Sequence, residues 1–470
     1  MDPSAPPNAA PDSTSLLLRG VRRSVALLAA GEAVNKAARF AAAVVLARSL
    51  SLDQFGLLNV GLAIGGIVVV LVRLGLPDLG TREVAASPAR AAEYAGRIVT
   101  PQVLALLTLV AGAVAVVAVV DPAWTAFAAI AGLSMLGLAA SADWLLRGQE
   151  RMRQLGTASG LTGIATLAST SAAVAISGDA RVALIAFALA ELIGAGLTWR
   201  LAHLPRPPRP QLRGARTLLR QSWPMAVSGV VIYAYYANID TLIIAATRSA
   251  EEAGIYSGGY RLFLALNAIV IFAGQAILPV ATRLSVAGAQ GERASLLSGA
   301  AAPLVAYGLL CAAGAALVGE FVLSVLFGAE FQSGAPTLTL LCLAVPWYAL
   351  GFPMGYALIA ERRSRAYMAG ALLGFVSNLA LCLLLIPRFG IEGAGVATLV
   401  AFATATLCWL GGQRMVRQLV PTLAILVATT ALTAGALAAE VSTVPAGMVT
   451  VGAALGVLWR GRTARVAPPA

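Results

Sequence analysis

The chain has 470 residues, of which 59% are hydrophobic and only 11% are charged, and its formal net charge is +12. A soluble domain carries roughly 25% charged residues, so this composition excludes an ordinary soluble protein. Apolar runs recur along the whole chain at about 20 residues each, which is the length of a membrane-spanning helix and unlike the short alternating strands of a membrane β-barrel.

In chain order, the sequence predicts a polar, proline-rich, disordered cytoplasmic tail (residues 1–15) and then about 14 membrane-spanning helices. The tail is unlike a signal peptide, because the apolar segment after it is long and contains charged residues. The predicted spans are 24–47, 54–75, 98–120, 123–146, 157–178, 180–201, 223–247, 258–282, 298–320, 335–359, 366–387, 391–411, 420–438 and 443–459.

A basic, proline-rich segment divides these spans into six before it and eight after it. Because six is even, the seventh span starts on the same side as the first, which permits a parallel repeat. ARSLSLDQFGLLNVG (47–61) and TRSAEEAGIYSGG (247–259) support a repeat over chance similarity, since both give Arg-Ser, acidic residues and then Gly. We predict an all-α integral membrane protein with an N-terminal six-helix lobe (16–202), a basic cytoplasmic linker (203–222), a C-terminal six-helix lobe (223–412), and an extra helix pair with a tail (413–470).

Most of the 33 basic residues lie in the N-terminal flank and in every second loop after it. Examples are Arg22, Arg147, Arg363 and Arg460, whereas the intervening loops hold few arginines. This distribution follows the positive-inside rule and predicts a multi-pass protein of the cytoplasmic membrane with both termini in the cytoplasm. Topology therefore explains the basic charge, and no nucleic-acid partner is needed.

The sequence offers little support for an enzyme. The four cysteines all lie in predicted spans without CxxC spacing, and the only histidine, His203, begins the basic linker, so no metal site is predicted. There is no phosphate-binding P-loop, zinc-protease motif or nucleophile elbow. The predicted outer loops are short, which disfavours a membrane glycosyltransferase or polymerase.

Four polar residues of the first span share one helix face: Glu32, Asn35, Lys36 and Arg39, at spacings i, i+3, i+4 and i+7. Lys36 is the only lysine of the chain. Insertion scales assign about 2.5–3.5 kcal/mol to Arg, Lys or Asp at a helix centre, so this face cannot contact lipid. We predict that it lines a water-filled cavity; the alternative is a Glu32–Lys36 pair inside the bundle, with Arg39 partnered elsewhere.

Other polar residues lie in or near the membrane. In the seventh span, Tyr233, Tyr236 and Asp240 share one face, which either lines the cavity or places the tyrosines in an interfacial belt. Arg261 begins the eighth span. Arg73 lies near the cytoplasmic end of the second span, and extension of its side chain to the interface is the favoured interpretation.

Four carboxylates are predicted to lie at depth: Glu32, Asp143, Glu191 and Asp240. Each is a candidate for binding a coupling proton or Na⁺, because burial brings a carboxyl group closer to titration at working pH. The alternative is that they pair with arginines. Gly156/Gly160 and Gly351/Gly355 have the GxxxG spacing of close helix packing.

Five segments within residues 20–415 are distinctive: LARSLSLDQFGLLNVGLAI, LGLPDLGTREVA, NIDTLIIAATRSAEEAGIYSGGYRL, AILPVATRLS and LLLIPRFGIEGAGVATLVA. These segments resemble the polysaccharide-repeat-unit flippases, whose superfamily also contains lipid II flippases and multidrug/toxin extrusion antiporters. The resemblance implies two six-helix lobes around a central cavity that is lined by the first, second, seventh and eighth spans and opens alternately to each side.

The resemblance also implies that cavity cations meet the pyrophosphate of a lipid-linked oligosaccharide. Lys36, Arg39, Arg73 and Arg261 stand on the corresponding helices, with Asn35 beside them, and Tyr233 and Tyr236 would stack on sugar rings. The expected function is a flippase for polyprenyl-pyrophosphate-linked repeat units in surface polysaccharide export. It would need no cofactor beyond H⁺ or Na⁺, and its partners would be membrane lipids and the polymerase and glycosyltransferases of the same pathway. The alternative is an ion-coupled exporter of small drugs, which predicts a cavity dominated by acids.

Overall fold

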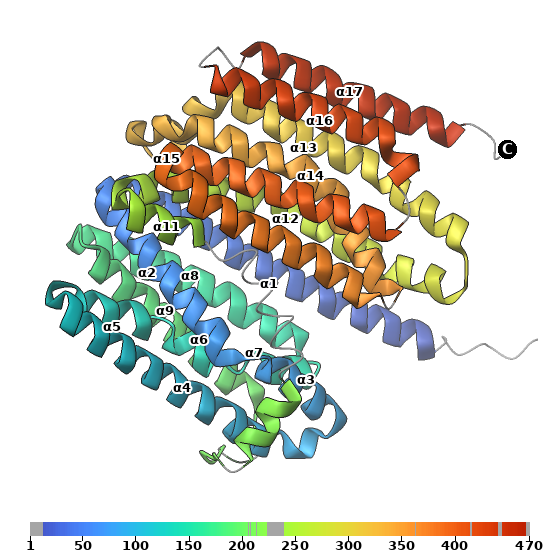
Figure 1. The fold of residues 1–470 in the computed structure, drawn as a ribbon. Helices are drawn as coiled ribbons and strands as arrows, with labels where there is room; N and C mark the ends of the chain where they lie inside the picture. Colours follow the sequence, from blue (N-terminus) through green and yellow to red (C-terminus); the bar gives the residue numbers. More distant parts are fainter. Residues whose placement is uncertain are drawn as a thin grey trace, which may run out of the picture. The chain divides into compact units, whose positions relative to one another are not determined.

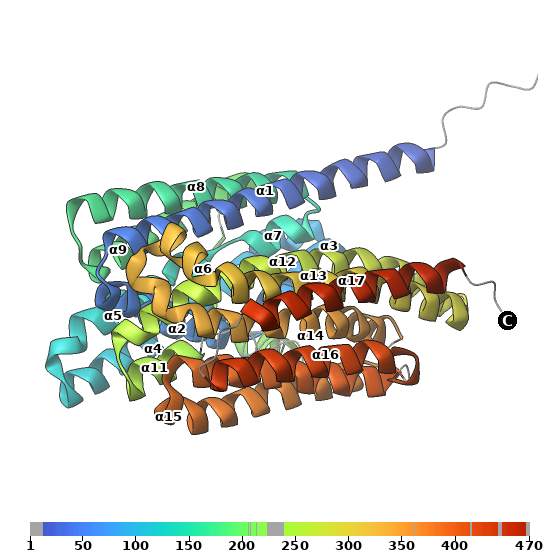
Figure 2. The ribbon, with the colours of Figure 1, turned by 90° about the horizontal axis from the view of Figure 1, so that it is seen from above.

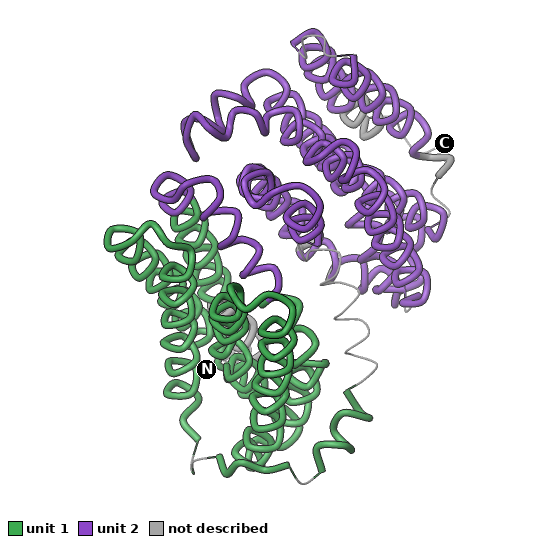
Figure 3. Tube along the Cα trace, turned by 60° about the vertical axis from the view of Figure 1, so that its left-hand side comes forward, with its two compact units in different colours: residues 1–43, 65–229 green, residues 44–64, 230–470 purple. Residues whose placement is uncertain are grey.

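The computed structural model describes residues 13–204, 206, 208–212, 214–222, 239–361, 363–413, 416–439 and 444–466. These residues are almost entirely helical and contain no β-strand, which confirms the all-α class. By packing, the chain forms two compact units (Figure 3). Unit 1 comprises Met1–Ala43 and Gly65–Gly229, and unit 2 comprises Val44–Ile64 and Val230–Ala470.

Unit 1 combines membrane-length helices with several short ones. Helix α9 packs against α8, α5 and α6, and α3 packs against α7. The elements are α1 (Ser13–Ser49) as far as Ala43, the second part of α2 (Leu52–Arg73), α3 (Leu76–Ala86), η1 (Pro88–Arg90), α4 (Ala91–Val120), η2 (Pro122–Trp124), α5 (Thr125–Leu133), α6 (Leu136–Ala140), α7 (Asp143–Gly148), α8 (Met152–Ile176) and α9 (Ala180–Ala202).

Unit 2 is organised around helix α14, whose apolar stretch is wholly buried. Helices α12, α13 and α15 pack against it, and α17 lies on α13 (Figure 1). The elements of this unit, besides the end of α1 and the first part of α2, are α11 (Ile239–Thr247), α12 (Ala250–Val286), α13 (Gln290–Phe327), η3 (Ala329–Gly334), α14 (Ala335–Ala360), α15 (Ser364–Gln413), α16 (Val416–Ala438) and α17 (Val444–Val466).

The protein is a multi-pass membrane protein. Among the described residues, 10 helices are long and apolar enough to span a bilayer, and Val444–Leu458 is a shorter apolar helix. Helix α15 covers two predicted spans, 366–387 and 391–411. Between them its backbone leaves helical geometry at Gly390 (φ 58°, ψ −138°), so the helix has two parts joined at a kink. Helix α1 is not among the ten, and most of the seventh predicted span lies outside the described residues. The count of fourteen therefore stays a prediction.

The fourth predicted span is not one helix. It consists of α5, α6 and α7, with breaks at Ser134–Met135 and Ser141–Ala142. At the second break, the Ser141 backbone is extended (φ −64°, ψ 141°), and the Ala142 N–H donates to Thr198 Oγ1 at 3.0 Å. Within a membrane, non-helical backbone is tolerated where it is buried in protein or lines a cavity.

The segment 76–97, which we expect to be a loop, contains helix α3. Gly75 precedes this helix in the left-handed region (φ 70°), and Pro77 stands in its first turn, where the missing N–H has no cost. Leu76, Leu79 and Val84 anchor α3 in a core with Trp144 of α7. Apolar anchoring of one face explains why so short a helix is stable.

Glycines bring α1 and α8 into close contact, and the two helices run side by side in Figure 2. A Cβ on Gly31 would lie 2.0 Å from the Gly156 carbonyl oxygen, and a Cβ on Gly163 would lie 2.6 Å from the Asn35 Cα. There is therefore no room for a side chain at Gly31 or at Gly163. This confirms close helix packing at Gly156, whereas a Cβ on Gly160 would come no nearer than 3.5 Å to its neighbours, which is an ordinary contact.

Candidate functional site

Unit 1 contains a polar cavity of about 190 Å³ that is open on one side. It is formed by α1, the end of α2, α6, α7, α8 and α9, together with the break at Ser141. Its lining residues are Glu32, Asn35, Arg39, Arg73, Gly137, Leu138, Ser141, Asp143, Arg147, Leu155, Ala158, Ser159, Thr162, Glu191, Gly194, Ala195 and Thr198. Several carboxylates and arginines that are far apart in the sequence therefore meet in one place.

Arg39 is the centre of a hydrogen-bond network that joins α1, α8 and α9. Its Nε donates to Asn35 Oδ1 at 2.8 Å, and its Nη2 forms an ion pair with Glu191 of α9. Asn35 Nδ2 in turn donates to Ser159 Oγ of α8 at 3.0 Å. The Glu191 side chain is only 4% exposed, whereas that of Arg39 is 31% exposed. The pair therefore holds a buried carboxylate while keeping the guanidinium at the cavity surface.

A second group of charges also lines the cavity. Arg73 Nη2 donates to Asp143 Oδ1 at 2.7 Å, and Arg147 Nη2 lies 3.2 Å from Asp143 Oδ2. This ion pair gives Arg73 a partner within unit 1, and its extension to the interface stays a prediction. Asp143 stands at the start of α7, directly after the second break of the fourth span, and this position brings its carboxylate within reach of the end of α2.

The formal charges of the cavity residues sum to zero, but they are not paired one to one. Glu32, Asp143 and Glu191 carry three formal negative charges, and Arg39, Arg73 and Arg147 carry three positive ones. One carboxylate serves both Arg73 and Arg147, so this group of three side chains carries a net formal charge of +1. A cavity dominated by acids, as the drug-exporter alternative predicts, is not what unit 1 presents.

Among the described residues of the proposed binding set, Lys36 and Arg261 do not line this cavity. Lys36 is exposed on α1. Arg261 lies in unit 2, where its Nη2 donates to Asn59 Oδ1 at 2.6 Å and its guanidinium stands over the Phe55 ring, 5.8 Å from the centroid. Tyr233 and Tyr236 lie outside the described residues. For the whole set, a role in substrate binding stays a prediction.

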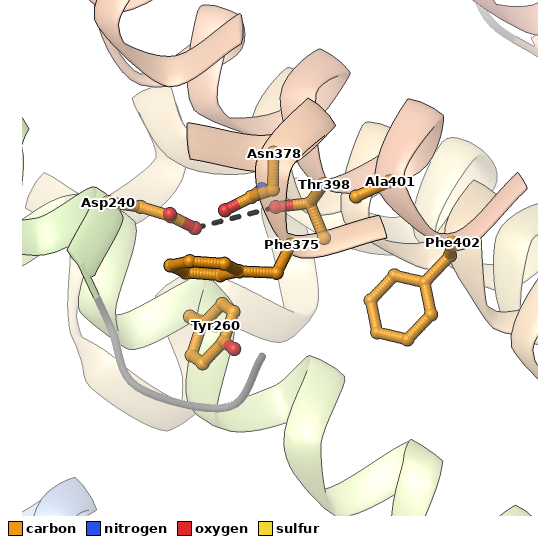
Figure 4. Close-up of a pocket in the computed structure, with 7 residues that line it drawn as sticks. All are labelled: Asp240, Tyr260, Phe375, Asn378, Thr398, Ala401 and Phe402. Carbon is orange, nitrogen blue, oxygen red and sulfur yellow. Dashed lines mark hydrogen bonds between the residues drawn. The ribbon is translucent and has the colours of Figure 1, made fainter. Parts of the chain in front are cut away.

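Asp240 forms a separate polar site in unit 2 (Figure 4). Its carboxylate accepts from Tyr256 Oη at 2.6 Å and, more weakly, from Cys382 Sγ and Thr398 Oγ1, each at 3.4 Å. The residue is 5% exposed, and it makes no ion pair within the described part of the chain. A cavity of about 10 Å³ adjoins it, lined also by Tyr260, Phe375, Asn378, Ala401 and Phe402.

Sequence reasoning missed several lining residues. Serine and threonine are common in membrane helices, so nothing in the sequence marks Ser159, Thr162 or Thr198 as cavity residues. The sequence predicts a cytoplasmic loop position for Arg147, because this residue directly follows the apolar stretch of the fourth span. The i+4 spacing from Asp143 to Arg147 was the available sign that the two could pair.

Comparisons with known proteins agree with this architecture. Residues 21–285, more than half of the chain, match the family model described as polysaccharide biosynthesis protein. A relative, the probable low-salt glycan biosynthesis flippase Agl15 of Haloferax volcanii, is 26% identical over 216 residues. That match covers 45% of this chain and 45% of Agl15, so the chain spans less than half of that relative's length.

Solved structures share the fold at low identity. A lipid II flippase, MurJ, in an inward closed conformation, superimposes with a TM-score of 0.72 at 12% identity, covering 93% of this chain and 98% of that one. An inward-facing multidrug resistance transporter of the MATE family in the MOP superfamily gives a TM-score of 0.64 at 12% identity, covering 83% and 97%. On the family match, this chain belongs to the polysaccharide biosynthesis protein family.

Proposed function

We propose that this chain moves polyprenyl-pyrophosphate-linked oligosaccharide repeat units from the cytoplasmic to the outer leaflet of the cytoplasmic membrane, by alternating access and without covalent chemistry. Family membership, the flippase name of its relative Agl15 and the fold shared with the lipid II flippase support this function. The observation that carries it is the group of arginines around a cavity of about 190 Å³ among the membrane-length helices of unit 1.

The arginines suit an anionic headgroup. A guanidinium has five N–H donors in a planar fork that matches phosphate oxygens, and the bonds of Arg39 to Asn35 and Glu191 use only two of its nitrogens. Arg73 and Arg147 share one carboxylate. A pyrophosphate could therefore bind to Arg73 and Arg147 while their contacts with Asp143 loosen. The balanced charge of the empty cavity would allow the site to release its ligand and reset.

The test is translocation in proteoliposomes that contain purified protein and a lipid-linked oligosaccharide, measured by accessibility of the glycan to an added lectin or glycosidase. Arg39→Ala and Arg73→Ala should each reduce the rate at least about tenfold, since a charge-assisted hydrogen bond contributes roughly 1.5–3 kcal/mol. The matched control is Arg153→Ala, an exposed arginine of α8 that does not line the cavity. Equal rates for all three variants and the parent chain would contradict the proposal.

Asp240 is the carboxylate that we propose for the coupling ion. Glu191 and Asp143 are already engaged by arginines, whereas Asp240 is buried among a phenol, a thiol and a hydroxyl. In Figure 4, Asn378 and Thr398 of α15 point toward it, so the site offers carboxylate, amide and hydroxyl groups around a space that holds about one water-sized sphere. Such a hard-oxygen site suits Na⁺, and the buried carboxyl alone suits a proton.

Replacement of choline by Na⁺ at constant ionic strength distinguishes these ions. For a Na⁺ site, the thermal unfolding midpoint of the purified parent chain should rise with Na⁺, and Asp240→Asn should abolish that rise. For a proton site, Na⁺ has no effect, and the transport rate of the parent chain depends on an imposed pH gradient while that of Asp240→Asn does not. If Asp240→Asn keeps the full ion dependence of transport, Asp240 is not the coupling residue.

A further inference from the structure

A second large cavity lies in unit 2, away from Asp240. Its volume is about 450 Å³, and it is lined by Ser285, Gln290, Arg293, Glu361, Arg363 and Gln413. These residues come from the end of α12, the start of α13, the turn between α14 and α15, and the end of α15. The positive-inside pattern places all four segments at the cytoplasmic end of the bundle.

The charged residues of this cavity form one connected group. Arg293 Nη1 forms an ion pair with Glu361 Oε1, and Arg363 Nη1 lies 3.4 Å from Glu361 Oε2. Arg363 Nη1 also donates to the Gly412 carbonyl at 2.5 Å, which ties the turn to the end of α15. Two guanidinium groups thus share one carboxylate, and the group carries a net formal charge of +1.

Three buried polar atoms of this cavity have no hydrogen-bond partner within the described structure: Arg293 Nε, Gln413 Oε1 and Ser285 Oγ. Gln413 is only 7% exposed, and its other amide atom, Nε2, donates to the Met354 carbonyl at 3.3 Å. Buried polar atoms in folded proteins are nearly always paired, so unpaired atoms around one space indicate a missing polar partner. Here the missing partner must accept from a guanidinium and also offer a donor to an amide oxygen.

We propose that this cavity binds a phosphate group. A singly protonated phosphate accepts from Arg293, Arg363 and the Ser285 hydroxyl, and its P–OH donates to Gln413 Oε1. The net positive charge favours an anion over a cation, and the planar fork of arginine matches phosphate oxygens. The same group is offered by free phosphate or a phosphorylated metabolite in the cytoplasm, and by the headgroup of an anionic phospholipid of the inner leaflet.

Binding is measured as the rise in thermal unfolding midpoint of the purified full chain in two arms. The first arm uses phosphatidylcholine nanodiscs titrated with inorganic phosphate against chloride of equal ionic strength. The second uses phosphate-free nanodiscs with an increasing fraction of phosphatidylglycerol. A response in the first arm identifies a soluble ligand, and a response confined to the second identifies a lipid headgroup.

The variants make the assignment specific to this cavity. Arg363→Gln should weaken the response about tenfold in apparent affinity, because it removes a charge-assisted contact. The matched control Arg283→Gln, an exposed arginine of α12 outside the cavity, should respond like the parent chain. Glu361→Gln removes the opposing negative charge and should bind at least as tightly as the parent chain, which a misfolded variant could not do.

The proposal is overturned if neither arm moves the midpoint of the parent chain. It is also overturned if Arg363→Gln and Arg283→Gln respond alike, or if Glu361→Gln loses binding. None of these readouts depends on glycan transport, so the outcome is separate from that of the flippase proposal.

Discussion

At the scale of single residues, the membrane interior explains why the charges of unit 1 occur in connected sets. A charged side chain inside a bilayer is costly unless it meets a partner or water. Arg39 meets both conditions, since it pairs with the buried Glu191 and remains partly exposed to the cavity. Asn35 links this pair to Ser159 on α8. The network therefore fixes the side chains that we propose to contact the substrate.

The Arg39–Glu191 pair predicts a specific stability pattern. Glu191→Gln should lower the thermal unfolding midpoint, because it leaves Arg39 facing an amide instead of a carboxylate, a loss of about 1–3 kcal/mol. Arg39→Gln should cost a similar amount. The double variant Arg39→Gln/Glu191→Gln should be no less stable than either single variant, because the interaction can be lost only once. Additive losses in the double variant would mean that the two residues do not interact.

At the scale of helices, close approach and interruption build the cavity. Gly31 and Gly156 let α1 and α8 touch at backbone distance, which brings Asn35 against Ser159. The break before α7 positions Asp143 for Arg73, and the Thr198 hydroxyl compensates an N–H of that break. Two uninterrupted helices with larger residues at the crossing could not place these side chains around one space.

Substitution at the α1–α8 crossing should disturb the cavity without removing any charge. In Gly156→Ala, the added Cβ would lie 2.6 Å from the Leu27 carbonyl oxygen and 2.9 Å from the Leu28 Cα, so α1 must shift. We expect a lower unfolding midpoint and a reduced glycan translocation rate. The control is Gly196→Ala on α9, where nothing lies within 4 Å of the added Cβ. This variant should retain the parent rate and be slightly more stable, because alanine favours a helix by up to about 1 kcal/mol over glycine. Equal effects of the two substitutions would contradict a role for the crossing.

At the scale of the whole molecule, the chain consists of two compact units that are not simply its two halves. The chain passes from unit 1 to unit 2 within α1, at Ala43–Val44, and returns within α2, at Ile64–Gly65. Large apolar side chains remain exposed along α4, α9 and α15, as expected of helices that face lipid rather than water. The distribution of arginines predicts an orientation in which both termini lie in the cytoplasm.

This orientation predicts the behaviour of reporter fusions. A fluorescent protein fused after Ala470 should fold and fluoresce, because folding requires the cytoplasm, and alkaline phosphatase at the same site should be inactive. Alkaline phosphatase inserted at Gly178–Asp179, in the turn between α8 and α9, should be active, because the positive-inside pattern places this turn outside. The opposite pair of results would show the inverted topology and would contradict the direction of transport that we propose.

The sequence by itself determined the membrane class, the approximate spans, the polar face of α1 and the family. These features depend on hydropathy, helical spacing and local motifs, all of which can be read along one segment. Only the tertiary structure decided which charges meet: Arg39 with Glu191, Arg73 with Asp143, and Arg293 with Glu361. Each of these pairs joins residues at least 68 positions apart. Their meeting depends on how helices cross and break, which the pattern of a single span does not contain.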